Sequence, residues 1–270
     1  MKKLFLIAAA IFATTFSVSA QDTEVKKERT KVKKERIERD YGNDNWDNWG
    51  GGTKVRGEGP SVSETRDVRG FKGVKSAISG DITLKQSSGG YKVVVEGQKN
   101  ILAHLITEVV DGNVKIYYEK GFSIQNKVPI KISLEAPAFD YIGLSGSGDV
   151  RTNGALSGDK MTVKLSGSGN FNLDELKYTD LAINLSGSGN VELSGKAATV
   201  DLSISGSGNL NADNLQAQKA NCSISGSGNL SLNVSKEMDA RISGSGDIRY
   251  SGNPASVKSK VSGSGEIKSK

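Results

Sequence analysis

The chain has 270 residues, of which 33 are glycine, 4 are proline and 6% are aromatic, and its formal net charge is +6. One cysteine excludes an intramolecular disulfide framework, and one histidine excludes a metal site that requires two. The sequence contains no run of 18 apolar residues, so no transmembrane helix is expected once the N-terminal signal is removed. We expect neither a cofactor nor a bound metal.

Residues 1–20 have the pattern of a secretory signal peptide. Lys2 and Lys3 precede a short apolar stretch, and Val18-Ser19-Ala20 forms a small-residue cleavage site. Removal of this segment lowers the Lys+Arg count from 36 to 34 against 30 acidic residues, which leaves a net charge of +4. That excess is too small and too dispersed to predict a nucleic-acid partner. The pattern predicts export, to the periplasm, the outer-membrane surface or the cell exterior.

Residues 21–60 are predicted to be a flexible linker. The stretch from Lys26 to Asp40 mixes charges of both signs and has too few apolar residues to offset the entropy of ordering. The part that follows is rich in Asn, Asp and Gly and carries both tryptophans, Trp46 and Trp49. These side chains are either a contact for a sugar, a partner or a membrane surface, or incidental residues of a spacer, and we favour the spacer.

Residues 61–140 are predicted to form a less regular β-rich cap that leads into a repeat. Within it, residues 109–114 place the turn sequence Asp111-Gly112 between apolar residues, which predicts a hairpin. Residues 77–84 look like one shortened copy of the downstream repeat, with two residues missing.

Residues 141–270 are dominated by a repeated tetrapeptide, Ser-Gly-Ser-Gly. Apolar residues flank every copy with a period of two, as Leu165 and Phe171 do around one of them, and this pattern is typical of a strand with one buried face. A unit of this length cannot bury its apolar face alone, whereas stacked copies can. The repeat therefore predicts an all-β chain, built as a parallel β-solenoid with rungs of about 19–20 residues. The tetrapeptide begins at Ser145, Ser166, Ser186, Ser205, Ser225, Ser243 and Ser262.

The same alternation assigns a direction to each residue of the unit. The glycines fall on the inward set, whereas the serines and the Asn or Asp that follows them point outward. We expect the glycines to mark a bend where the backbone comes close to an opposite wall. The remainder of each unit is expected to be a polar loop, and Cys222 is interpreted as a small core residue. One apolar residue of each loop should plug the interior, such as Leu156, Leu176, Leu215 or Val234.

Outward residues of stacked rungs lie about 4.8 Å apart, so identical polar side chains can form ladders. The asparagines that follow four of the tetrapeptides can therefore pass amide hydrogen bonds from rung to rung. We identify the outward serines and asparagines as a candidate binding face for a glycan or a cell-envelope protein. Its members are Ser147, Ser168, Ser188, Ser207, Ser227, Asn170, Asn190, Asn209 and Asn229.

The chain also resembles a known family, the auto-transporter adhesins with a head GIN domain, which are exported proteins of Bacteroidetes-type bacteria. The resemblance is carried by Val74–Ile82, Val93–Gly97, Val109–Ile116 and the recurring Ser-Gly-Ser-Gly-[Asn/Asp]-apolar units. It covers residues 65–267, so residues 61–140 would be the first half of the head GIN domain. It implies a right-handed, single-stranded β-helix and a role in adhesion, and it supplies no catalytic residues.

Three functions are compatible with this architecture. The first is an exported, non-catalytic adhesin that presents a regular polar face, and the second is a passive scaffold of the cell envelope. The third is a polysaccharide-active enzyme, for which the best acid pair is Asp201 and Asp239, two rungs or about 9.6 Å apart. Solvated surface acids explain this pair more simply, so we predict a protein that is not an enzyme.

Overall fold

The computed structural model describes residues 52–270, which form one compact unit. The expected signal peptide and most of the expected linker, with Trp46 and Trp49, lie outside the described residues. The described part is nearly all β, with 66% of residues in strands and 2% in helix, and its stacked parallel coils form a β-solenoid of about six turns. The predicted fold class is confirmed.

The first half of the described chain contains nine short strands and one helical turn. They are β1 (Thr53–Arg56), β2 (Ser61–Arg66), β3 (Gly73–Ser76), β4 (Asp81–Gln86), β5 (Lys92–Gln98), α2 (Lys99–Leu102), β6 (Leu105–Val110), β7 (Asn113–Tyr118), β8 (Phe122–Gln125) and β9 (Lys131–Ala136).

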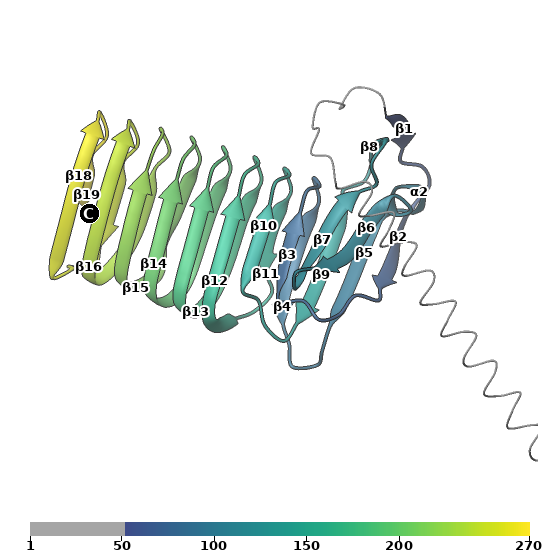
Figure 1. Ribbon diagram of the computed structural model, residues 1–270, viewed down its shortest axis with the longest axis horizontal. Helices are drawn as coiled ribbons and strands as arrows, with labels where there is room; N and C mark the ends of the chain where they lie inside the picture. Colours follow the sequence, from purple (N-terminus) through teal and green to yellow (C-terminus); the bar gives the residue numbers. More distant parts are fainter. Residues whose placement is uncertain (1–51) are drawn as a thin grey trace, which may run out of the picture. The chain divides into compact units, whose positions relative to one another are not determined.

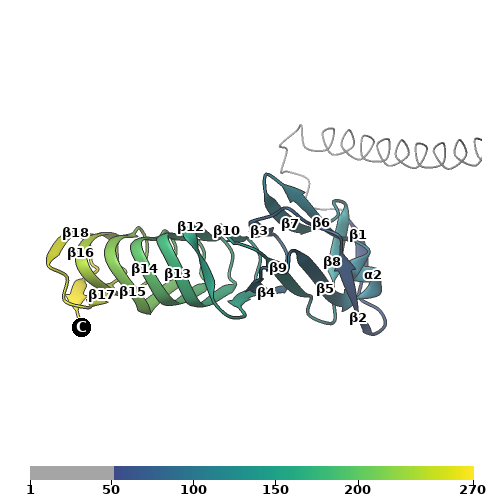
Figure 2. The same cartoon turned by 90° about the horizontal axis from the view of Figure 1, so that it is seen from below.

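The second half holds the regular stack, and Figures 1 and 2 show its strands side by side in chain order. Its strands are β10 (Tyr141–Leu144), β11 (Asp149–Thr152), β12 (Leu156–Leu165), β13 (Asn170–Leu185), β14 (Asn190–Ile204), β15 (Asn209–Ile224), β16 (Leu230–Gly244), β17 (Ile248–Ser251), β18 (Ser256–Gly263) and β19 (Ile267–Ser269).

The first half mixes antiparallel and parallel pairing. Strands β2, β5 and β9 pair antiparallel, and β6 and β7 form the predicted hairpin. Asp111 and Gly112 in its turn both have positive φ, 51° and 71°, as a two-residue type I′ turn requires. The end of the expected linker is not a spacer, since Thr53–Arg56 forms β1 and pairs with β8.

The regular stack begins before residue 141. Strands β3 and β4 pair in parallel with β10 and β11, as each later rung pairs with the next. The bend between them contains Ala77, Ile78, Ser79 and Gly80, and it is as long as the bend from Ser145 to Gly148. The expectation of two missing residues is therefore wrong: Ile78 occupies the position of the first glycine, and no residue is deleted.

The interior follows the predicted alternation. Inward residues such as Leu165, Leu185 and Ile204 are each 1% exposed, and the four expected plug residues are 0–1% exposed. The stretches around the plugs are strand rather than loop, because β13 to β16 run from one bend to the next. A second corner interrupts them, where Glu175 has φ 56° and the register shifts between Leu173 and Leu176. Each rung thus has a short side before this corner and a longer stretch after it, in which the alternation of buried residues breaks once more between Tyr178 and Leu181.

The glycine bends pack on one another rather than on an opposite wall. A Cβ atom added to Gly167, Gly187 or Gly206 would collide with the carbonyl oxygen of the equivalent glycine in the preceding rung. Ile78 escapes this collision, since no bend lies beneath it: β3 stacks on β7 and β4 on β9, which are separate strands with β8 between them in the chain. Stacking of one bend on another is therefore what requires glycine at this position.

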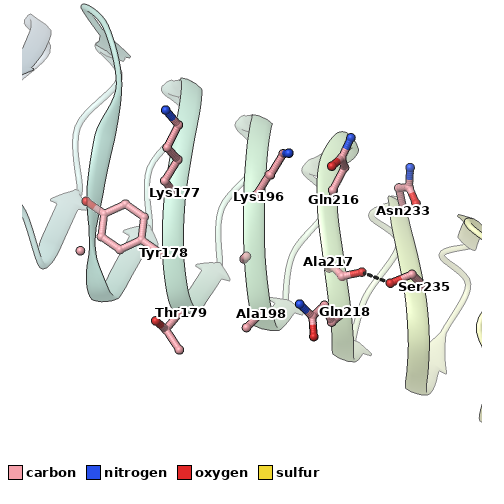
Figure 3. A pocket seen from close by; sticks show the side chains of 12 residues that line it. Lys177, Tyr178, Thr179, Lys196, Ala198, Gln216, Ala217, Gln218, Asn233 and Ser235 are labelled. Atoms are coloured by element: carbon pink, nitrogen blue, oxygen red, sulfur yellow. Dashed lines mark hydrogen bonds between the residues drawn. The ribbon is translucent and has the colours of Figure 1, made fainter.

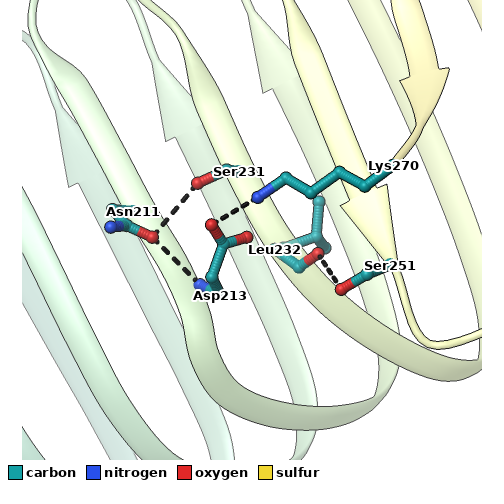
Figure 4. Close-up of polar contacts among 6 residues, drawn as sticks. All are labelled: Asn211, Asp213, Ser231, Leu232, Ser251 and Lys270. Carbon is teal, nitrogen blue, oxygen red and sulfur yellow. Dashed lines mark hydrogen bonds and ion pairs between the residues drawn. The ribbon is translucent and has the colours of Figure 1, made fainter.

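Polar contacts tie the second corners of the last rungs together (Figure 4). The Asn211 side-chain oxygen accepts hydrogen bonds from the Asp213 backbone N–H and from the Ser231 hydroxyl, both at 3.1 Å. Lys270 forms an ion pair with Asp213. These contacts hold the corners of β15 and β16 to the last residues of the chain.

Candidate functional site

The predicted polar residues lie together on one exposed surface, which we call the Ser/Asn face. It consists of the second serine of five tetrapeptides and the asparagine that follows four of them. Stacking of the bends brings these residues into two parallel columns, and all of them are exposed. The serines are Ser147, Ser168, Ser188, Ser207 and Ser227, and the asparagines are Asn170, Asn190, Asn209 and Asn229.

The asparagine column is a continuous hydrogen-bonded ladder. The Nδ2 group of Asn190 donates to Oδ1 of Asn170 at 3.1 Å, and Asn209 and Asn229 repeat this contact at 3.1 and 3.0 Å. The ladder begins at Asp149, whose carboxylate accepts the Nδ2 hydrogen of Asn170 at 2.9 Å. Because an amide has two N–H hydrogens, each asparagine keeps one donor for another partner.

The serine column is free of such bonds. No hydrogen bond joins the hydroxyl of any of its five serines to another residue of the chain between 52 and 270. Four rung spacings of about 4.8 Å give the column a length of about 19 Å. Within residues 52–270, the Ser/Asn face is therefore a row of unpaired hydroxyl groups beside a row of amides that each keep one N–H donor. The face has no charge between Asp149 and Asp247.

The two acids considered for catalysis lie where the repeat predicts. The register places Asp201, Asn221 and Asp239 in one column. Asn221 donates to the Asp201 carboxylate at 2.7 Å, and Arg241 pairs with Asp239 at 2.7 Å. Both carboxylates are thus engaged on a strand surface, and neither lines the groove described below.

Cys222 is a core residue, as expected. It is 3% exposed and lies between Leu202 and Ala240 in the register. Burial, together with the charges of Asp201 and Asp239, raises the pKa of its thiol from 9.0 to about 12. A thiol with so high a pKa is neutral near pH 7, and only the thiolate is an effective nucleophile.

A groove that we did not predict lies beyond the second corner of β13 to β16 (Figure 3), and Gly158 of β12 also lines it. Its volume is about 660 Å³. The backbone at Tyr178, Ala197 and Ala217 lies between its two edges, and the side chains of these three residues belong to the core and are at most 5% exposed. One edge is the column Lys177, Lys196, Gln216 and Asn233, and the other is Thr179, Ala198, Gln218 and Ser235.

Tyr178 lies beside Gly158 of β12 at one end of the groove. The tyrosine hydroxyl donates to the carbonyl oxygen of Phe139 at 3.0 Å. Burial, with a smaller effect of the Asp140 charge, raises the pKa of Tyr178 far above its ordinary value. Its hydroxyl therefore has a structural partner and is not available as an acid or base.

Within residues 52–270, no group of three or more His, Cys, Asp or Glu side chains is placed to hold a metal ion. In the same part of the chain, no helix has the length and apolar character needed to cross a membrane.

The fold places this protein in the class of parallel β-solenoids, with polar ladders on the bends and apolar residues inside. Within that class, the chain belongs to the family described as "Putative auto-transporter adhesin, head GIN domain", which matches residues 70–254. The resemblance seen in the sequence is therefore confirmed. No curated protein matches the chain.

Solved structures from several bacteria share the fold. A structure described as a "putative adhesin" from Bacteroides fragilis is 28% identical, with a TM-score of 0.77, and the match covers 80% of this chain and 100% of that one. A "putative lipid binding protein" from Parabacteroides distasonis is 25% identical, with a TM-score of 0.68 and coverage of 81% and 100%. A "putative adhesin" from Parabacteroides merdae is 22% identical, with a TM-score of 0.66 and coverage of 81% and 99%, and it supports the fold alone.

Proposed function

We propose that this protein is an exported, non-catalytic adhesin of the cell envelope, and that the Ser/Asn face contacts a glycan or an envelope protein. The observation that carries the proposal is the row of five exposed serine hydroxyls, held at a fixed spacing by the glycine bends and without a hydrogen-bond partner among residues 52–270. Such a row offers the same weak contact many times, and the contacts add up when a partner repeats as well. The family name and the signal-like N-terminus support adhesion and export.

The absence of a catalytic role is part of the same proposal. Glycoside hydrolysis needs two carboxyl groups that face one substrate at no more than about 9.5 Å. Asp201 and Asp239 are separated by Asn221 in their column, and each has a polar partner on the strand surface. Asp201→Asn and Asp239→Asn should therefore leave any polysaccharide turnover at the background level of the unmodified protein. If the unmodified protein cleaves a polysaccharide and either variant abolishes that activity, the adhesin proposal is wrong and the protein is an enzyme.

The adhesin proposal is tested by binding of the mature protein to a panel of glycans and isolated envelope proteins. The triple variant Ser168→Ala, Ser188→Ala and Ser207→Ala removes three unpaired hydroxyls without exposing a buried group, so it should fold normally and lose binding. The matched control is Ser203→Ala with Ser223→Ala, which removes hydroxyls bonded to each other at 3.1 Å on another outward column. Should the panel show no binding and gene deletion leave cell adhesion unchanged, the protein is a passive scaffold.

A further inference from the structure

The groove on β13 to β16 carries a pair of positive charges that no acidic side chain within residues 52–270 pairs with. Lys177 and Lys196 are directly opposite each other on adjacent rungs, and both are exposed. Neither forms an ion pair or a hydrogen bond with any residue in the described part of the chain. The next residues along their column, Gln216 and Asn233, have no charge.

The column beyond the other edge of the groove contains lysines that face acidic residues instead. There, Lys160 pairs with Asp180 at 3.7 Å, and Lys219 pairs with Glu237 at 3.0 Å, each from one rung to the next. Like charges directly opposite each other on neighbouring strands are destabilising, whereas opposite charges stabilise. The Lys177–Lys196 pair therefore costs free energy in the isolated protein, and an anion at the groove would relieve that cost.

The rest of the lining offers hydrogen bonds along a straight line. Gln216, Gln218 and Asn233 supply amide groups, and Thr179 supplies a hydroxyl. The residues between the two edges, Tyr178, Ala197 and Ala217, are buried, so a chain can lie flat on the backbone there. From β13 to β16 the groove extends over three rung spacings, about 14 Å. We infer that this groove binds a linear acidic polysaccharide, whose carboxylates lie at Lys177 and Lys196 and whose hydroxyls contact the amide edge.

Two other polyanions fit the groove less well. A single-stranded nucleic acid stacks its bases on exposed aromatic rings, but Tyr178 is 5% exposed and its hydroxyl is bonded to Phe139. A membrane surface requires large apolar side chains that enter the lipid, and the exposed large hydrophobic residues within 52–270, Val109, Val257 and Val261, lie outside the groove. A polysaccharide needs only the charges and the polar edge that are present.

The test is affinity electrophoresis of the mature protein in gels that contain sodium polygalacturonate, methyl-esterified polygalacturonate or poly-glutamate. The variant Lys177→Gln with Lys196→Gln places in both rungs the residue that Gln216 already provides in the same column, so folding should be preserved. The control Lys164→Gln with Lys260→Gln removes the same charge from a column outside the groove lining. Circular dichroism checks that both variants are folded.

We expect polygalacturonate to retard the unmodified protein and its methyl ester to have little effect. The groove variant should bind about tenfold more weakly, as expected for the loss of two exposed ion pairs, and the control should bind normally. The proposal is overturned if polygalacturonate causes no retardation, if both double variants lose binding equally, or if poly-glutamate is bound as tightly. This site is separate from the Ser/Asn face, so the triple serine variant should still bind polygalacturonate, and its failure to do so would also overturn the groove assignment.

Discussion

Replacement of Gly206 by alanine tests the stacked-bend explanation of the repeat most directly. An added Cβ atom would lie 2.2 Å from the carbonyl oxygen of Gly187, so the two atoms have to separate by 0.8 Å to reach even 3.0 Å. The rungs cannot part freely, because the Ser205 backbone N–H donates to Leu185 at 2.8 Å beside the bend. The Gly187 oxygen also accepts N–H groups from Ser207 and Gly208, at 3.3 and 3.2 Å.

Crowding of this kind costs about 1–3 kcal/mol, and the weakened hydrogen bonds add about 1 kcal/mol. We therefore expect Gly206→Ala to lower the free energy of unfolding by about 3 kcal/mol. Urea denaturation followed by circular dichroism measures this change. The control is Gly89→Ala, whose added Cβ lies 3.4 Å from the Ser87 hydroxyl and should change stability by less than about 1 kcal/mol.

The first bend provides the opposite test. Ile78 fits at the equivalent of a glycine position because no bend lies beneath it, and its side chain is buried, with 2% exposed. Ile78→Gly should therefore leave a cavity and cost at least about 2 kcal/mol. A loss below about 1 kcal/mol for Gly206→Ala, or a neutral Ile78→Gly, would refute the reasoning that the preceding bend decides which residue fits.

Three further predictions concern the ladder, the thiol and the groove floor. Asn209→Asp replaces a donor 3.1 Å from Asn190 Oδ1 by an acceptor, so it should lower the free energy of unfolding by about 1–2 kcal/mol at pH 7. This loss should be largely relieved at pH 3, where the carboxyl group is protonated. Urea midpoints equal to those of the unmodified protein at both pH values would contradict this prediction. Burial raises the pKa of Cys222 above its unfolded value, so the thiol's contribution to stability is complete below pH 9 and is lost as the pH rises towards 12. Cys222→Ala should therefore flatten the alkaline decline of stability, measured by urea denaturation across that interval. A decline equal to that of the unmodified protein would contradict this prediction. Tyr178→Phe removes the hydrogen bond to Phe139 and should lower stability by about 1 kcal/mol, whereas Tyr250→Phe, in which no such bond is lost, serves as the control in the same assay.

The period of the tetrapeptide was sufficient to predict the rung, the inward residues and the asparagine ladder. Each of these depends only on position relative to the bend, and the bends stack in strict order. The part of the structure that the glycine bends approach closely was not predictable in this way. Alternation distinguishes inside from outside, but it does not show that the space at Gly206 is filled by the preceding rung rather than by an opposite wall.

The second corner was missed for a different reason. Residues 174–180 are mostly polar and would form a loop in isolation. In the solenoid, this segment pairs with the equivalent segments of the two neighbouring rungs, which complete its backbone hydrogen bonds. Pairing with neighbours therefore overrides the local preference. The likeness of residues 77–84 to the repeat predicted two missing residues, whereas the register shows that Ile78 and Ser79 fill the positions of Gly and Ser in the bend.

The groove could not be predicted because the number of residues between stacked positions changes at the second corner. Asn170 and Asn190 are paired 20 residues apart, but Lys177 and Lys196, beyond the corner, are paired 19 residues apart. Counting from the tetrapeptide would place Lys177 opposite Ala197, and the two lysines would not face each other. A repeat aligned separately on the plug residues, Leu176 and Leu215, could have revealed the second corner.

Stacking dictates most of the residues in this protein, and that makes the exceptions informative. Glycine is required where bends stack, apolar residues are required inside, and asparagine completes a ladder on the bend. None of these requirements explains Lys177 opposite Lys196, since the polar residues Gln216 and Asn233 fill the same column without repulsion. A local arrangement that disfavours the fold and has no structural compensation is the feature expected of a binding site. The groove, more than the regular face, is therefore where a specific ligand of this protein should be sought first.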